Sequence, residues 1–142
     1  MAEDPQERAE LIIAAMLRDD AFSRLLGMEL VRVTPGNATV RLTVREDMVN
    51  GLGVCHGGVT FSLADSALAF ASNGNGRVTV SIENSIGYPA AARLGDVITA
   101  EAVEESAGRR LAFYNVMVRK QDGATVGIFR GTVYRTEKEH VV

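Results

Sequence analysis

The sequence predicts an α+β protein in which a six-stranded antiparallel sheet packs on one long apolar helix. The helix is expected over residues 56–73, a stretch rich in Ala, Leu and Phe that contains no proline. Segments with the apolar and polar alternation of strands lie on both sides of it. Since 142 residues suit one core, we expect a single domain over residues 1–142.

The part of the chain before the long helix predicts a helix and a hairpin. An amphipathic helix is expected within residues 1–20, where Asp4-Pro5 supplies a cap and a first helical residue. Residues 22–27 show no clear period, and they fit either an irregular bridge to the next strand or a helical turn. Alternation then predicts strands at 28–33 and 38–45, joined by a Pro-Gly-Asn turn.

The part after the long helix predicts four strands and a short flexible tail. The first strand, 77–88, is expected to place Val78, Val80 and Ile82 on one face and Thr79, Ser81 and Glu83 on the other. The remaining strands are expected at 97–105, 111–120 and 124–135, with Ala-Gly and Asp-Gly turns between them. The charged end, 136–142, is expected to fray.

Composition and charge exclude two classes of partner. A formal net charge of −3 gives no basic surface for nucleic acid. Serines and Asp65 interrupt the only long apolar stretch, so we expect no membrane partner. The start of the chain has no basic leader, and the single cysteine, Cys55, fits a reducing compartment. We therefore expect a cytoplasmic protein.

Asp65 is the residue that points to a functional site. It is the only formal charge between His56 and Asn73, and a lone carboxylate in an apolar helix is costly unless it is paired or used. At about 100° per residue it belongs to one stripe of small and polar side chains. That stripe comprises Gly58, Ser62, Asp65, Ser66, Ala69 and Ser72.

A second candidate group lies at the start of the same helix. The backbone N–H groups of Gly57 and Gly58 are unpaired there, at the positive end of the helix dipole, and suit a polarised carbonyl or an oxyanion. Gly57 and Asp65 are roughly 12 Å apart along the helix, too far to reach one reacting carbon. Two helices antiparallel across a two-fold axis would bring Gly57 of one chain beside Asp65 of the other.

Two residues of the loop before the helix each fit either a structural role or a role in the site. Asn50 precedes Gly51, so its side chain fits either a turn or a ligand contact. His56 fits a helix cap as well as a site residue. A dinucleotide-binding loop is excluded because the third glycine would fall at His56, and two histidines with one cysteine are too few for zinc.

The pattern Asn50-Gly51-x-Gly53-x-x-His56-Gly57-Gly58-x-x-Phe61-x-Leu63-Ala64-Asp65 resembles the hotdog-fold acyl-CoA thioesterases, most closely their phenylacetic-acid-degradation (PaaI) branch. The resemblance covers about residues 20–135 and implies the hotdog topology for the sheet and helix. Ala69 departs from another branch of these thioesterases, which places Thr one turn after the carboxylate.

The resemblance implies a reaction and a set of site residues. Asp65 would be the nucleophile or general base, the Gly57 amide would polarise the thioester carbonyl, and Asn50 and His56 would be their companions. Substrate-binding positions would be Gly58, Phe61 and Ser81. It implies hydrolysis of aryl or arylacetyl thioesters, with coenzyme A as part of the substrate, no other cofactor and no metal. It also implies a homodimer with shared active sites that forms a tetramer.

Two other functions remain open from the sequence. One is hydrolysis of short- and medium-chain acyl-CoA with broad specificity, and the other is acyl-CoA binding without catalysis. A hydratase is disfavoured, because His56 is badly placed to pair with Asp65 along one helix. Candidate contacts for the coenzyme A phosphates are Arg93, Arg109, Arg110, Arg119 and Lys120.

Overall fold

A computed structural model describes residues 4–142, so residues 1–3 of the expected N-terminal helix lie outside the described part. The helices are α1 (Pro5–Asp19), α2 (Ala21–Leu25) and α3 (Gly57–Asn73), with a 3-10 turn, η1, at Glu46–Met48. The strands are β1 (Glu29–Thr34), β2 (Asn37–Thr43), β3 (Arg77–Gly87), β4 (Val97–Ala107), β5 (Leu111–Lys120) and β6 (Thr125–Glu139).

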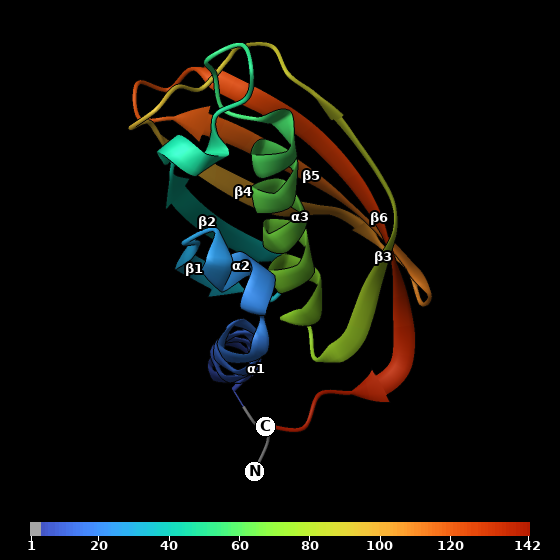
Figure 1. Cartoon of the computed structure of the whole chain (residues 1–142). Coiled ribbons are helices and arrows are strands. Elements are labelled where there is room, and N and C mark those ends of the chain that lie inside the picture. Colours follow the sequence, from blue (N-terminus) through green and yellow to red (C-terminus); the bar gives the residue numbers. More distant parts are fainter. Residues whose placement is uncertain (1–3) are drawn as a thin grey trace.

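The six strands form one antiparallel sheet in the order β1-β2-β4-β5-β6-β3. The sheet curves around α3, while α2 lies alongside that helix and α1 lies near its C-terminal end (Figure 1). This arrangement confirms the predicted α+β class, the central helix and the six strands. Helix α3 separates the first two strands from the last four in the sequence. The first strand after it, β3, lies at the far edge of the sheet, beside β6.

The core lies between α3 and the concave face of the sheet. Leu63, Leu68 and Phe70 of α3 are fully buried. They meet the inward residues of the strands, among them Val40, Leu42, Ile98, Val116 and Val118. Full burial of a side chain of this kind contributes about 1.5–3 kcal/mol, so this contact fixes the position of α3.

The expected bridge after α1 contains a helix. The Asp20 carboxylate caps α2 by accepting hydrogen bonds from the backbone N–H and the hydroxyl of Ser23, at 3.0 and 2.6 Å. Ser23 is buried, and its hydroxyl lies 2.8 Å from that of Ser66 in α3. Thus α2 contacts the stripe of α3 that carries Asp65.

Strand β3 follows the predicted alternation only as far as Ser81. Thr79 is buried while Val80 and Ile82 are about half exposed. A register shift between Ser81 and Glu83 then marks a β-bulge against β6. The prediction that Glu83 shares a face with Thr79 and Ser81 is therefore wrong, and the bulge decides which side chain of β3 reaches the site.

The end of the chain differs from the expected frayed tail. Residues 136–139 belong to β6, and the Arg8 guanidinium lies 2.8 Å from the Glu139 carboxylate. The His140 ring nitrogen Nε2 lies 2.8 Å from the side-chain oxygen of Asn73, at the end of α3. Among residues 4–142, no helix combines the length and the apolar character needed to cross a bilayer.

Candidate active site

The start of α3 leaves one N–H group open. His56 is the cap residue, and its Nδ1 accepts a hydrogen bond from the Gly58 N–H at 2.8 Å. The His56 side chain therefore serves as the cap, and the prediction that the Gly58 N–H is unpaired is wrong. The Gly57 N–H has no acceptor within residues 4–142, as expected for a first helical residue. It is the donor at this helix end that a ligand can use.

The side chain of Asn50 organises the loop that leads into α3. Its Oδ1 accepts hydrogen bonds from the backbone N–H groups of Leu52 at 2.9 Å and Val54 at 3.2 Å. The Asn50 side chain therefore stabilises a turn, which is one of the two roles that the sequence allowed. The amide NH2 of the same side chain is the part left to contact a ligand.

A cavity of about 360 Å³ adjoins Gly57 and Asn50. Its walls combine apolar side chains such as Val54, Ala90 and Val126 with polar groups of Asn50, Thr60 and Tyr88. The Tyr88 hydroxyl donates to the Gly57 carbonyl oxygen at 2.8 Å, so the phenol covers the first turn of α3. Cys55 also lines the cavity, and burial raises the pKa of its thiol, which disfavours a thiolate nucleophile.

Asp65 lies half-buried on the less covered face of α3. Its Oδ1 accepts a hydrogen bond from the side-chain NH2 of Asn84, at 3.2 Å. Burial raises the pKa of Asp65 above its usual range, the Asn84 hydrogen bond works against that rise, and the negative charge of Asp20 adds to it.

The serines beside Asp65 do not bond to it. Ser62 and Ser66 share the stripe of Asp65 on α3, but the Ser62 hydroxyl donates to the Gly58 carbonyl oxygen at 2.7 Å. The hydroxyl of Ser66 pairs with Ser23. Both hydroxyls are engaged elsewhere, and the hydrogen-bond donor to the Asp65 carboxylate is Asn84 of β3.

The predicted site residues fall into two groups within one chain. The Gly57 group comprises Asn50, His56, Gly57 and Gly58, together with Tyr88. The Asp65 group comprises Asp65, Asn84 and Ser81, whose hydroxyl donates to the Asn84 side-chain oxygen at 2.8 Å. The two groups are roughly 12 Å apart along α3, so the geometry of one chain does not join them.

Phe61 lies between the two groups on α3. Its ring makes an edge-to-face contact with Phe129, with 5.3 Å between ring centroids. It does not line the cavity beside Gly57. Its expected role in substrate binding therefore depends on space outside that cavity.

The candidate phosphate contacts separate into opposite ends of the sheet. Arg93, Arg119 and Lys120 lie at the end that carries Gly57, where Ile98 pairs with Lys120 and Ala92 lines the cavity. Arg109 and Arg110 lie in the β4–β5 turn at the other end. Their assignment to coenzyme A stays a prediction.

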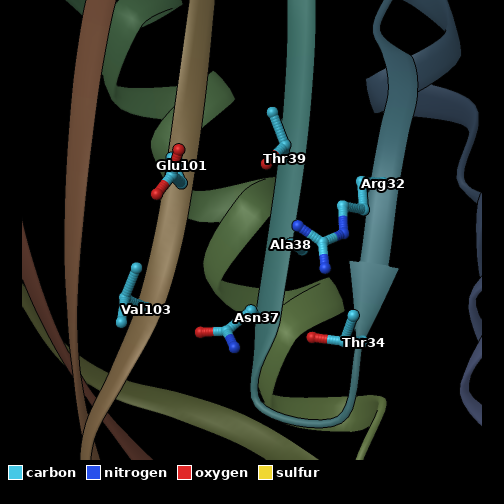
Figure 2. A pocket seen from close by; sticks show the side chains of 7 residues that line it. All are labelled: Arg32, Thr34, Asn37, Ala38, Thr39, Glu101 and Val103. Atoms are coloured by element: carbon cyan, nitrogen blue, oxygen red, sulfur yellow. The ribbon is translucent and has the colours of Figure 1, made fainter. Parts of the chain in front are cut away.

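A second hollow, of about 240 Å³, lies over β1, β2 and β4 away from both groups. Figure 2 shows the side chains of Arg32, Asn37 and Glu101 around it, and none of the predicted site residues is among its lining. Within residues 4–142, no three His, Cys, Asp or Glu side chains lie close enough together to hold a metal ion.

Sequence reasoning missed Asn84 and Tyr88. Tyr88 is the last residue of a predicted strand and belongs to no motif. Asn84 carried a weak signal, because Asn is disfavoured inside strands and its presence there calls for another reason. Neither could be assigned to Asp65 or Gly57 before the strand was placed beside α3.

Comparison with known proteins identifies the family. The model of the thioesterase superfamily matches residues 52–127. Acyl-coenzyme A thioesterase PaaI of Escherichia coli is 36% identical over 121 residues, 85% of this chain and 86% of that protein. Acyl-coenzyme A thioesterase 13 of Homo sapiens is 35% identical over 127 residues, 85% of this chain and 89% of that protein.

Solved structures agree with the sequence relatives. E. coli PaaI, from the phenylacetic acid degradation operon, superposes with a TM-score of 0.93 and 33% identity, covering 96% of this chain and 99% of that one. A hypothetical thioesterase of Streptococcus pneumoniae, solved with coenzyme A, gives a TM-score of 0.82 at 26% identity, covering 89% and 98%. The chain therefore belongs to the thioesterase superfamily and has the hotdog fold of its PaaI branch, as the sequence resemblance predicted.

Proposed function

We propose that this thioesterase-superfamily enzyme hydrolyses acyl-CoA thioesters, with aryl and arylacetyl groups as the favoured acyl part. One observation carries the proposal: a half-buried carboxylate, Asp65, is held on the open face of α3, and the same helix presents a free N–H at Gly57. A base or nucleophile and an oxyanion donor are the two groups that thioester hydrolysis needs.

The chemistry follows from those two groups. The thioester carbonyl oxygen accepts a hydrogen bond from the Gly57 N–H. Asp65 then either takes a proton from a water that attacks the carbonyl carbon, or attacks that carbon itself to form a mixed anhydride that water later opens. In both routes the C–S bond breaks, the sulfur of coenzyme A gains a proton, and the acyl group leaves as a carboxylic acid.

The preference for an aryl group rests on the PaaI relative, which belongs to a phenylacetic acid degradation operon. The test is a panel of phenylacetyl, hydroxyphenylacetyl, benzoyl, acetyl and hexanoyl thioesters, followed through thiol release. We expect kcat/KM for the aryl thioesters to exceed that for hexanoyl-CoA by about tenfold or more, since one or more misfitted groups in an apolar pocket cost about 1–3 kcal/mol. A higher kcat/KM for hexanoyl-CoA would overturn the aryl preference. If the protein binds coenzyme A but hydrolyses none of these thioesters, the proposed thioesterase activity is overturned.

A dimer that joins the two groups is part of the proposal. Strand β3 is 11 residues long and lies at an edge of the sheet, where its outer backbone groups have no strand partner within residues 4–142. Val80 and Ile82 on this strand are 50% and 57% exposed. An unpaired apolar edge supports association with a second copy, which would set Gly57 of one chain near Asp65 of the other. Tetramer formation and a cytoplasmic location remain further expectations.

Mixing two inactive variants tests whether the site is shared. Asp65→Asn removes the carboxylate, and Gly57→Pro removes the N–H, because proline has none. In a dimer with one chain of each kind, one of the two sites keeps both groups. Random co-assembly should therefore restore about a quarter of the wild-type sites. Activity measured after co-expression that stays at the level of either variant alone would place each site within one chain.

A further inference from the structure

The bulge in β3 decides which side chain faces Asp65. Residues directly opposite each other in an antiparallel pair share a face. Ser81 pairs with the buried Val133, whereas Glu83 pairs with Thr132 and Asn84 pairs with the buried Gly131. Ile82 is the extra residue. In a regular register without the bulge, Ile82 would pair with Thr132 and Glu83 with Gly131, so Glu83 would face α3. The bulge therefore places an amide, and not a second carboxylate, beside Asp65.

Gly131 on β6 makes room for that amide. A Cβ at this position would lie 2.8 Å from the Asn84 side-chain oxygen and 2.5 Å from Leu68 Cδ2 on α3. Any side chain there would push Asn84 or Leu68 away. The close packing of β6, β3 and α3 at this point therefore depends on a glycine opposite Asn84.

Hydrogen bonds fix the orientation of the Asn84 amide. The Ser81 hydroxyl donates to its Oδ1 at 2.8 Å, which turns the NH2 group toward α3. That NH2 donates to Asp65 Oδ1 at 3.2 Å. An ionised carboxylate only accepts hydrogen bonds, so this chain from Ser81 through Asn84 to Asp65 favours the ionised form.

We propose that Asn84 is a positioning residue that holds the Asp65 carboxylate oriented and ionised for the thioesterase reaction. The inference rests on the proposed function, since it assigns Asn84 a role through Asp65. Asp20, at the cap of α2, is the charged group that acts against Asn84 here, by raising the pKa of Asp65 together with burial. Ser81 then serves this site through Asn84.

Two substitutions at Asn84 test the role through the pH dependence of kcat/KM. Activity requires ionised Asp65, so it falls as pH drops through the pKa of that group. Asn84→Ala removes the donor, and we expect the acid limb to move up by about one pH unit and kcat at pH 7 to fall about tenfold. Asn84→Asp keeps the shape but sets a like charge beside Asp65, so its acid limb should move further up.

Controls separate positioning from loss of fold and from failure of the proposed function. Thr132→Ala, beside Gly131 on β6 but on the opposite face of the sheet, should leave the pH profile unchanged, and melting temperatures report folding. An acid limb that stays in place in both Asn84 variants, with Asp65→Asn inactive, overturns the role of Asn84 alone. If Asp65→Asn is as active as wild type, the proposed function itself fails.

Discussion

Asp65→Asn is expected to lower kcat for acyl-CoA hydrolysis by about 10³-fold, while the melting temperature stays within a few degrees of wild type. General base or nucleophilic groups contribute roughly 10²–10⁴-fold, and a neutral amide can neither take a proton from water nor attack the carbonyl. The substitution keeps the size of the side chain and an oxygen that can accept the hydrogen bond from Asn84.

Folding should withstand this change. Asp65 is half-buried with one hydrogen-bond donor and no cation bonded to it among the described residues, so removal of its charge also removes a desolvation cost. The measurements are steady-state hydrolysis of phenylacetyl-CoA, which gives kcat, and thermal unfolding. Asp65→Ala serves as a second variant that deamidation cannot revert. Retention of more than about a tenth of wild-type kcat in both variants would remove Asp65 from the mechanism.

Gly57→Pro is expected to lower kcat by about 100- to 1000-fold, the range found when one oxyanion donor is removed. Proline is well tolerated at the first residue of a helix, where its missing N–H takes no part in helix bonding. The preceding residue, His56, has φ −59° and ψ 132°, which is the region that a residue before proline prefers. The backbone can therefore keep its course while losing this donor.

Gly57→Ala is the matched control for that substitution. In both variants a new Cβ would lie 3.1 Å from the Tyr88 ring and hydroxyl, so both press on Tyr88 in the same way. Only proline also removes the N–H. The ratio of kcat between the alanine and proline variants thus isolates the donor. Equal rates in the two variants would show that Gly57 contributes space and not a hydrogen bond.

Local sequence determined the elements and the chemical groups. The helix over residues 56–73 followed from its composition and its missing prolines, and the structure has it at Gly57–Asn73. Period-two alternation located all six strands. Asp65 stood out because burial of a single charge in an apolar helix is costly. That cost can be recognised from the sequence of the helix alone, before its spatial neighbours are known. The family followed from the motif around that helix.

Tertiary structure decided how those groups are held. Asn84 faces Asp65 only because a bulge shifts the phase of β3 against β6 and because Gly131, 47 positions further along the chain, leaves room there. Ser62 and Ser66, which share the stripe of Asp65, bond instead to Gly58 and Ser23. Periodicity specifies which residues can share a face of one element, whereas register and close approach between distant elements arise only when they pack. The sequence by itself thus determined the reactive group, and packing between β3, β6 and α3 decided what orients it.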